Sequence, residues 1–132
     1  MKPVPHSPRI LVVDDLADNI LLLKTFLESE GYQVDVADTA SLALDKLTIS
    51  PPDLLLLDVM MPHMDGYELT RKIRRDDRLR SLPIVLMTAH AELCRIKGLA
   101  VGATDFVRKP IRFEVLHATI QNLLTARSKY RV

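Results

Sequence analysis

Cysteine, tryptophan and glycine are scarce in this sequence of 132 residues, which holds one cysteine, no tryptophan and four glycines. Because Cys94 is the single cysteine, an internal disulfide and a metal cluster built on cysteine are both excluded. We expect Cys94 to pack inside a helix rather than to react. We also expect no histidine metal site, because no pair at metal-binding spacing occurs among His6, His63, His90 and His117.

An excess of charge of one sign is also missing, because 18 basic and 17 acidic residues give a formal net charge of +1. Nothing in this balance calls for a polyanionic partner. The run from Arg71 to Arg80 is basic, but it contains its own acids and no aromatic residue that could stack on bases. We therefore interpret it as a solvated helix face and expect no nucleic acid as a partner of this domain.

Long apolar runs are absent as well. The runs present are too short to span a membrane, and the start Met-Lys-Pro-Val-Pro lacks the apolar segment of a signal peptide. These absences predict a cytoplasmic protein without a membrane partner.

The sequence contains enough apolar material for one globular domain, with 48% hydrophobic and 27% charged residues. Three prolines and the lack of periodicity in residues 1–8 predict a flexible amino-terminal tail. We place the folded domain at residues 9–127 and a short carboxyl-terminal tail at residues 128–132. There is no sign of a second domain or of an internal repeat.

Five apolar runs indicate β-strands. The third contains four consecutive leucines, a pattern typical of a parallel strand that is buried on both faces, and it ends at Asp58. A carboxylate at the end of such a strand needs a cationic partner to offset its desolvation. The predicted strands are Arg9–Val13, Tyr32–Ala37, Leu54–Asp58, Pro83–Thr88 and Thr104–Arg108.

Apolar residues at helical spacing follow each strand. In the first helix the set is Leu16, Ile20, Leu23 and Leu27, with Leu22 and Phe26 alongside. Thr39 is placed to cap the second helix, and Asp65 stands three residues before Glu68 in an acidic variant of the capping box. The predicted helices run from Leu16 to Glu30, from Thr39 to about Ile49, from Asp65 to about Asp77, from Ala91 to Val101 and from Arg112 to about Ala126.

Five strands that alternate with five helices predict an α/β fold, in which helices cover both faces of a parallel sheet. In the doubly wound strand order 2-1-3-4-5, the first, third and fourth strands are neighbours. Their carboxyl ends meet at one edge of the sheet, where ligands bind in folds of this kind.

Side chains that can bind ions or react lie at those carboxyl ends. Asp14 and Asp15 follow the first strand, Asp58 and Thr88 end the third and fourth, and Lys109 follows the fifth. Carboxylates that converge at one edge raise each other's pKa values unless a cation neutralises them. Mg²⁺ is the natural choice, because it prefers oxygen ligands and keeps several waters in an open site.

A carboxylate such as Asp58 can attack phosphorus and become an aspartyl phosphate. Mg²⁺ and the ammonium group of Lys109 would then neutralise the phosphoryl oxygens, and the Thr88 hydroxyl would act as a sensor of the phosphoryl group. Each residue also has an ordinary alternative role. Asp14 or Asp15 would cap the first helix, Thr88 would be a routine end-of-strand residue, and Lys109 would be a surface residue.

Several separated motifs, in this order, resemble the receiver domain of two-component response regulators. They are Asp14-Asp15, the segment Leu-Leu-Leu-Leu-Asp58-Val-Met-Met-Pro-x-Met-Asp65-Gly66, Met87-Thr88-Ala89, and Phe106-x-x-Lys109-Pro110. The resemblance covers about Arg9 to Arg127 and implies a flavodoxin-like fold. It also implies that a sensor histidine kinase or a phosphotransfer protein is the partner that supplies the phosphoryl group.

The resemblance further assigns roles to the site residues. Asp58 would accept the phosphoryl group from a phosphohistidine, and Lys109 would pair with the phosphoryl oxygens. Asp15, Asp58 and the backbone carbonyl of Met60 would bind Mg²⁺, with Asp14 assisting through water. The peptide between Lys109 and Pro110 is expected to be cis.

The same resemblance implies how a phosphorylation signal would spread. Thr88 would move towards the phosphoryl group and Phe106 would turn inward, reshaping the face formed by the fourth helix, the fifth strand and the fifth helix. An effector protein of unknown identity would read that face, which is also the candidate surface for a homodimer. The domain would not be an enzyme for other substrates, because it would catalyse only its own phosphorylation and dephosphorylation.

Two residues beside the site are predicted to set the lifetime of the phosphorylated state. Met60, two residues after Asp58, is apolar and would hinder attack by water on the phosphoryl group. His90, two residues after Thr88, would donate to a phosphoryl oxygen when it is protonated. The prediction fails if Met60→Asn and His90→Ala both leave the dephosphorylation rate unchanged.

Other functions on the same kind of fold stay open. A phosphatase with an aspartate nucleophile usually needs a second acid where this sequence has Met60. A flavin-binding module would need a phosphate loop after the first strand, where Asp14 and Asp15 would repel phosphate. A phosphate-independent protein-binding module is a further alternative. The sequence identifies neither the kinase and its signal nor the effector, and its ordinary ends slightly favour a free-standing regulator over a fragment of a longer protein.

Overall fold

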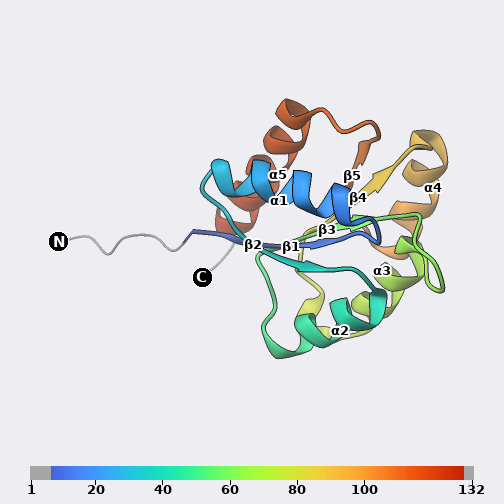
Figure 1. Cartoon of the computed structure of the whole chain (residues 1–132). Coiled ribbons are helices and arrows are strands. Elements are labelled where there is room, and N and C mark those ends of the chain that lie inside the picture. The colour runs from blue at the N-terminus through green and yellow to red at the C-terminus, as the bar shows by residue number, and fades with distance from the viewer. Residues whose placement is uncertain (1–6, 130–132) are drawn as a thin grey trace.

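The structure is a computed structural model that describes residues 7–129. Residues 1–6 of the expected amino-terminal tail and residues 130–132 lie outside the described residues. The strands are β1 (Arg9–Val13), β2 (Gln33–Ala37), β3 (Leu54–Asp58), β4 (Ile84–Thr88) and β5 (Asp105–Arg108). The helices are α1 (Ala17–Ser29), α2 (Ala40–Ile49), α3 (Gly66–Arg74), α4 (Ala91–Val101) and α5 (Phe113–Lys129), with a short 3-10 helix η1 (Asp77–Leu79) (Figure 1).

All four strand pairs are parallel, and the strand order is β2-β1-β3-β4-β5. The predicted α/β fold and its strand order are therefore confirmed. Strand β3 occupies the centre, and each of its four leucines is 0% exposed. Burial of a leucine side chain contributes about 1.5–3 kcal/mol, so this strand is a major source of stability.

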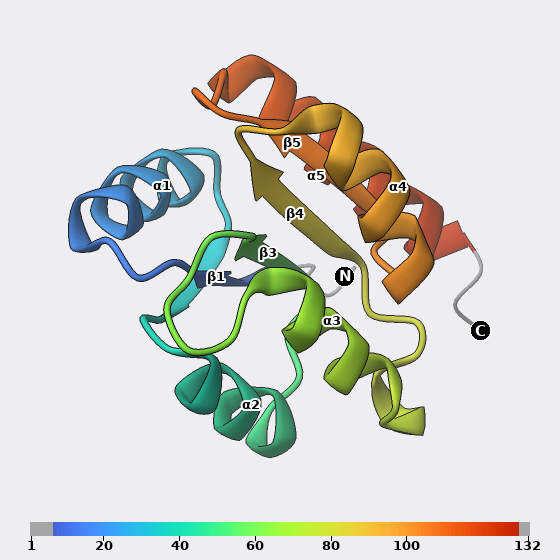
Figure 2. The same cartoon turned by 90° about the vertical axis from the view of Figure 1, so that its right-hand side faces the viewer.

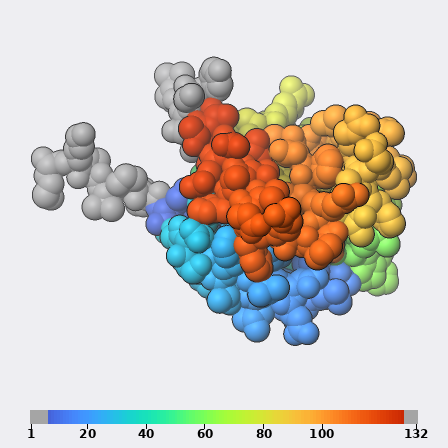
Figure 3. All heavy atoms as spheres, turned by 90° about the horizontal axis from the view of Figure 1, so that it is seen from above, coloured from blue at the N-terminus to red at the C-terminus, as the bar shows by residue number. Residues whose placement is uncertain are grey.

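The core divides into two clusters, one on each face of the sheet, because successive side chains of a strand point to opposite faces. On one face, Ile10, Val12, Leu54 and Leu56 pack against α1 and α5. On the other face, Leu11, Val13, Leu55 and Leu57 pack against α2, α3 and α4. Figure 2 shows this three-layer arrangement, and Figure 3 looks onto the face covered by α1 and α5.

The end of α3 differs from the prediction. The helix ends at Arg74 and not near Asp77, because the Arg74 guanidinium bonds the chain that follows. Its Nη1 donates to the carbonyls of Leu79 at 2.8 Å and Arg80 at 3.3 Å. These bonds turn the segment back, and the Asp76 side chain caps η1 by accepting a hydrogen bond from the Arg78 amide.

The apolar surface of α1 is also narrower than the sequence predicts. Leu23 and Leu27, one helical turn apart, face the sheet and are buried. Leu22 lies about 100° around the helix from Leu23 and is 57% exposed. Leu16 precedes the helix at the N-cap position and is 55% exposed. These two leucines are therefore surface residues and not part of the core.

Several smaller predictions agree with the structure. Cys94 is buried in α4, and burial raises the pKa of its thiol. Thr39 caps α2 by accepting from the Leu42 amide at 3.1 Å, and Asp65 caps α3 by accepting from the Glu68 amide at 2.9 Å. Helix α5 differs from the prediction, because it continues to Lys129, three residues past the expected end and into the segment predicted as a tail. Within residues 7–129, no helix has the length and apolar character needed to cross a membrane.

Candidate functional site

The carboxyl ends of four strands bring the predicted site residues to one edge of the sheet. Strand β1 ends at Val13, immediately before Asp14 and Asp15, and it pairs with β3, whose last residue is Asp58. Strand β3 pairs in turn with β4, which ends at Thr88. In the adjacent strand β5, Arg108 pairs with Thr88, so Lys109 follows at the same edge.

The three acids of this edge form a compact cluster. One carboxylate oxygen from each of Asp14, Asp15 and Asp58 can be chosen so that all three oxygens lie within 4.8 Å of one another. Asp14 is 1% exposed and Asp58 is 2% exposed, whereas Asp15 is partly exposed. The donor set consists of oxygen atoms only and opens to solvent on the Asp15 side. This chemistry fits a hard divalent cation such as Mg²⁺.

Asp14 is held by neighbours that the sequence did not single out. Its Oδ1 accepts a hydrogen bond from the Leu16 amide at 2.9 Å, and its Oδ2 accepts one from Asn19 Nδ2 at 3.2 Å. Burial is the main cause that raises the pKa of Asp14, and the negative charge of Asp58 adds to it. The two hydrogen bonds and the positive charge of Lys109 act in the opposite direction. Asn19 is therefore a positioning residue that only the three-dimensional contact reveals.

Asp58 forms an ion pair with Lys109, although 51 positions separate them in the sequence. The distance from Lys109 Nζ to Asp58 Oδ1 is 2.7 Å, and the same oxygen accepts a hydrogen bond from the Met60 amide at 3.3 Å. No residue in the described part of the chain donates a hydrogen bond to Asp58 Oδ2. One oxygen of this buried carboxylate is thus fixed by a cation, and the other keeps its full capacity to coordinate or to attack.

Gly66 allows α3 to begin directly against the end of β3. A Cβ atom at this position would lie 2.7 Å from the Asp58 carbonyl oxygen and 2.9 Å from Val59 Cα, and both of these are backbone atoms. The Gly66 amide donates to the Val59 carbonyl at 2.9 Å. The absence of a side chain therefore lets the loop after Asp58 close tightly, which fixes the position of the acidic cluster.

Thr88 is buried beside the cluster but does not bond the acids. Its Oγ1 accepts a hydrogen bond from the His90 amide at 2.9 Å, at the start of α4. His90 itself has an exposed side chain. Tyr67 of α3 is nearly buried in the same region, and burial together with the neighbouring Cys94 raises its pKa. No pattern in the sequence singles out Tyr67, which occupies an ordinary core position of the helix.

Phe106 occupies β5 and is only half-buried. It borders a cavity of about 150 Å³ that lies between α4 and β5, with Leu86, Cys94 and Gly98 among the other lining residues. Space is therefore available next to the aromatic ring on the core side.

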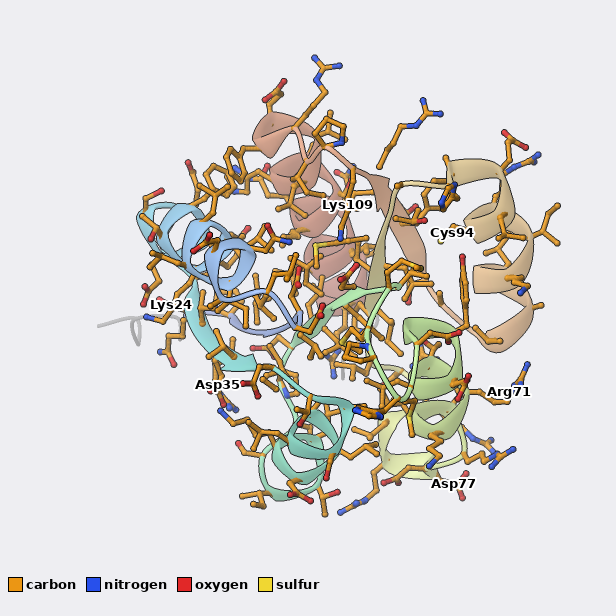
Figure 4. All side chains as sticks on the ribbon, turned by 45° about the vertical axis from the view of Figure 1, so that its right-hand side comes forward. Lys24, Asp35, Arg71, Asp77, Cys94 and Lys109 are labelled. Atoms are coloured by element: carbon orange, nitrogen blue, oxygen red, sulfur yellow. The ribbon has the colours of Figure 1, made fainter. Side chains whose placement is uncertain are left out.

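A cavity of about 270 Å³ leads to the acidic cluster from the side of α1. Asp14, Asn19, Leu22, Lys109 and Phe113 contribute to its walls. In Figure 4, Lys109 lies near the centre of the domain, above the carboxyl edge of the sheet. The peptide between Lys109 and Pro110 is cis, as expected. The site is thus accessible to a reactant that approaches between α1 and the segment before α5.

Comparison with known proteins gives a consistent result. A family model described as "Response regulator receiver domain" matches residues 10–121. The chain is 45% identical over 118 residues to the response regulator PleD of Caulobacter vibrioides, and it is 43% identical over 121 residues to the sensor protein EvgS of Escherichia coli. These matches cover 89% and 91% of this chain but only 26% of PleD and 10% of EvgS, so the chain corresponds to a small part of each relative.

A solved structure shows the same likeness in three dimensions. It is the receiver domain of the sensor histidine kinase PA1611 from Pseudomonas aeruginosa, described with a magnesium ion coordinated in its active site cleft. The TM-score is 0.84 at 30% sequence identity, with 91% of this chain and 99% of that chain covered. Family model, relatives and fold agree with the acidic edge built by Asp14, Asp15 and Asp58. The chain therefore belongs to the family of response regulator receiver domains.

Proposed function

We propose that this domain is the phosphoacceptor switch of a two-component phosphorelay, with Asp58 as the residue that is phosphorylated. The observation that carries this proposal is the asymmetric environment of the Asp58 carboxylate. Its Oδ1 is paired with Lys109, while its Oδ2 receives no hydrogen bond from the described residues. Such a carboxylate is held in place by a cation and still retains an oxygen that can act as a nucleophile.

The phosphoryl donor is a phosphohistidine on a sensor histidine kinase or on a phosphotransfer protein. Asp58 forms a new O–P bond while the P–N bond of the phosphohistidine breaks, and the electron pair of that bond returns to the imidazole nitrogen. The ammonium group of Lys109 then pairs with the phosphoryl oxygens instead of the carboxylate, because these oxygens now carry the negative charge. The net reaction transfers one phosphoryl group and needs no further reactant.

Asp14, Asp15 and Asp58 would hold Mg²⁺, together with the backbone carbonyl of Met60. The oxygen-only donor set supports this assignment, as does the magnesium ion described for the similar PA1611 receiver domain. When bound, the ion would supply positive charge that removes the repulsion among the acids and neutralises the incoming phosphoryl group. Asn19 would keep Asp14 oriented towards the same point.

The switch residues are Thr88 and Phe106. A phosphoryl group on Asp58 offers new acceptor oxygens to the Thr88 hydroxyl, and this favours an arrangement in which Thr88 has moved towards it. The cavity of about 150 Å³ next to Phe106 gives the ring room to turn inward. The changed surface would be the face of α4, β5 and α5, where Leu93, Ile96 and Leu99 are exposed.

Two exposed regions suit the expected protein partners. Exposed Leu22 lines the cavity that reaches Asp14 and Lys109, so it would give the phosphoryl donor an apolar contact close to the reacting atoms. The α4 leucines would serve an effector or a second copy of the chain.

We further propose a cytoplasmic location and no catalysis on other substrates, as expected of such a switch.

Mass spectrometry of the intact protein tests this function. After incubation with acetyl phosphate and Mg²⁺, the wild type should gain the mass of one phosphoryl group. Asp58→Asn should gain nothing, and omission of Mg²⁺ should abolish the adduct in the wild type. The matched control is Asp53→Asn, which changes an acid at the other end of β3 and should leave the adduct intact. An adduct that persists in Asp58→Asn would contradict the proposal.

The lifetime of the adduct tests the two flanking residues. The Met60 side chain is 67% exposed beside Asp58, and the exposed His90 side chain begins α4. Replacement of Met60 by asparagine should speed the loss of the phosphoryl group, because a polar side chain can orient the attacking water. His90→Ala should also change the rate. Identical decay curves for the wild type and both variants would exclude these residues as determinants of the lifetime.

A further inference from the structure

The amino-terminal side of the sheet holds a third cavity, which is larger than the two described above. Its volume is about 600 Å³, and its walls come from the segment between α3 and β4, the loop before β5 and the end of α5. Four arginines and no acidic residue belong to its lining: Arg74, Arg78, Arg80 and Arg127. The acidic cluster lies at the opposite ends of the strands, so this cavity is separate from the proposed phosphorylation site.

Arg74 is the fixed cation of this cavity. Its Nε donates to the Gly102 carbonyl at 2.8 Å, and its Nη2 donates to the Thr104 hydroxyl at 3.3 Å. With the bonds to the Leu79 and Arg80 carbonyls, the guanidinium is held between three segments of the chain.

These partners are all neutral, and Arg74 forms no ion pair with a carboxylate of residues 7–129. Partial burial lowers the pKa of the Arg74 guanidinium, because the charged form loses part of its solvation. An anion in the cavity would offset that loss.

Arg78 and Arg80 add two exposed cations at the rim. Each pairs with a nearby acid at 2.9 Å, Arg78 with Asp76 and Arg80 with Asp77. Arg78 is the more firmly held, because its Nε and Nη2 donate to the two oxygens of Asp76. The pair of Arg80 with the exposed Asp77 is of the weak surface kind, so the Arg80 guanidinium can turn towards a ligand with little loss.

The remaining wall of the cavity is largely apolar. Leu82 and Pro83 lie on one side, and Leu123 and Ala126 of α5 lie on the other. A small ion without an apolar part, such as free phosphate, would make no contact with this wall. The volume falls in the range of sites that take small organic molecules.

We propose that this cavity binds a small organic phosphate, with its phosphate group on the arginines and its organic body against the apolar wall. The planar fork of a guanidinium matches two phosphate oxygens at once, which makes arginine well suited to this task. The chemical class is a phosphate monoester of about the size of a mononucleotide. Binding there involves neither Asp58 nor Lys109.

Titration of the ¹⁵N-labelled protein with AMP, without Mg²⁺, tests this site by NMR. AMP serves as a probe that joins one phosphate to a planar body, and adenosine is the matched probe without charge. We expect saturable shifts for the amides of residues 78–82, 104 and 123–127, and no such shifts with adenosine. Inorganic phosphate should bind more weakly than AMP, because it lacks a body to contact the apolar wall.

Variants separate a specific site from a general attraction to positive charge. Arg80→Gln should weaken AMP binding about tenfold, because it removes one charge-assisted hydrogen bond to phosphate. Arg95→Gln is the matched control, since Arg95 is also exposed and paired three residues away, with Glu92, but lies outside the cavity. Arg74→Lys keeps the charge but loses the hydrogen bonds to Gly102, Leu79 and Arg80 that shape the cavity, and it should weaken binding as well.

Four outcomes would overturn the proposal. These are equal effects of Arg80→Gln and Arg95→Gln, AMP-induced shifts confined to the Asp58 edge, equal binding of phosphate and AMP, or no saturable shifts at all. Thermal unfolding of each variant without ligand verifies that a loss of binding does not reflect a loss of folding.

Discussion

The two ends of β3 carry aspartates in contrasting surroundings. At the amino end, Asp53 Oδ2 accepts a hydrogen bond from the Arg9 amide at 2.8 Å, and the Asp53 carbonyl accepts one from Arg127 at 2.6 Å. At the carboxyl end, Asp58 is buried against Asp14, and the repulsion between them contributes to the raised pKa of Asp14. One end joins neighbouring segments, whereas the other concentrates three carboxylates around the single ammonium group of Lys109, and the repulsion among them costs stability.

This difference indicates where the fold is stabilised and where it is kept reactive. Charges that are paired or hydrogen-bonded support the structure, and charges that are packed together without enough partners create a site for a ligand. Replacement of an acid should therefore change stability in opposite directions at the two ends, with a loss for Asp53→Ala and a gain for Asp14→Asn. Gly66→Ala and Asp35→Asn, which change a packing contact and an exposed ion pair, should give the largest and the smallest effects.

Gly66→Ala should be the most damaging of these changes. The new Cβ would meet the Asp58 carbonyl and the Val59 backbone, which cannot move without displacing the site. We expect the free energy of unfolding to fall by about 2–3 kcal/mol, measured by urea denaturation. Gly98→Ala is the control, because its Cβ would meet a side-chain atom, Leu86 Cδ1, at 3.1 Å. A similar loss in both variants would mean that the close approach at Gly66 has no special importance.

Asp53→Ala should destabilise the amino end without affecting function. The substitution removes the acceptor for the Arg9 amide, and we expect a loss of about 1–2 kcal/mol in urea denaturation. Phosphorylation by acetyl phosphate should proceed as in the wild type once the protein is folded. If the variant were as stable as the wild type, the view that this end supports the structure would be wrong.

Asp14→Asn should act in the opposite direction on stability. It removes one of the mutually repelling charges while Asn can still accept from the Leu16 amide, so the metal-free protein should gain about 1 kcal/mol. Mg²⁺ affinity, measured by calorimetry, should fall in the same variant. A stability loss together with unchanged Mg²⁺ binding would show that Asp14 serves the structure and not the metal.

The ion pair between Asp35 and Lys46 should give the smallest effect. The distance is 2.6 Å, but the Asp35 side chain is 47% exposed, so Asp35→Asn should cost only about 0.5 kcal/mol near neutral pH. The bonds from Lys46 and the Val36 amide lower the pKa of Asp35 below its ordinary value of 3.8. The stabilisation is therefore present above that value and is lost as the pH falls through the folded-state pKa. Denaturation curves of wild type and variant should converge at low pH.

The sequence predicted the strands well, because each is an apolar run between clear turn signals, and the strand order followed from the general rules of such folds. The end of α3 was predicted wrongly, since no glycine or proline marks it. A long-range contact of the Arg74 side chain ends the helix, and a one-dimensional pattern does not contain such contacts.

The candidate site was predictable in part. Acids and a lysine at strand ends indicate where side chains meet, and the pairing of Asp58 with Lys109 bears this out at 2.7 Å. The role of Asn19 in holding Asp14 was not predictable, because it depends on which side chain of α1 lies within hydrogen-bond distance of Asp14. The catalytic and switch roles themselves stay predictions until the phosphorylation experiments are done.

The hydrogen bond between the His90 amide and Thr88 Oγ1 has a consequence for signal fidelity. Under the proposed function, Thr88 must give up this bond when it turns to the phosphoryl group, so the start of α4 loses an acceptor. A bond of about 1 kcal/mol corresponds to a factor of about five in population at equilibrium. This single contact would thus help to keep unphosphorylated molecules in the inactive arrangement. Weakening it would raise the fraction of unphosphorylated molecules that adopt the active arrangement.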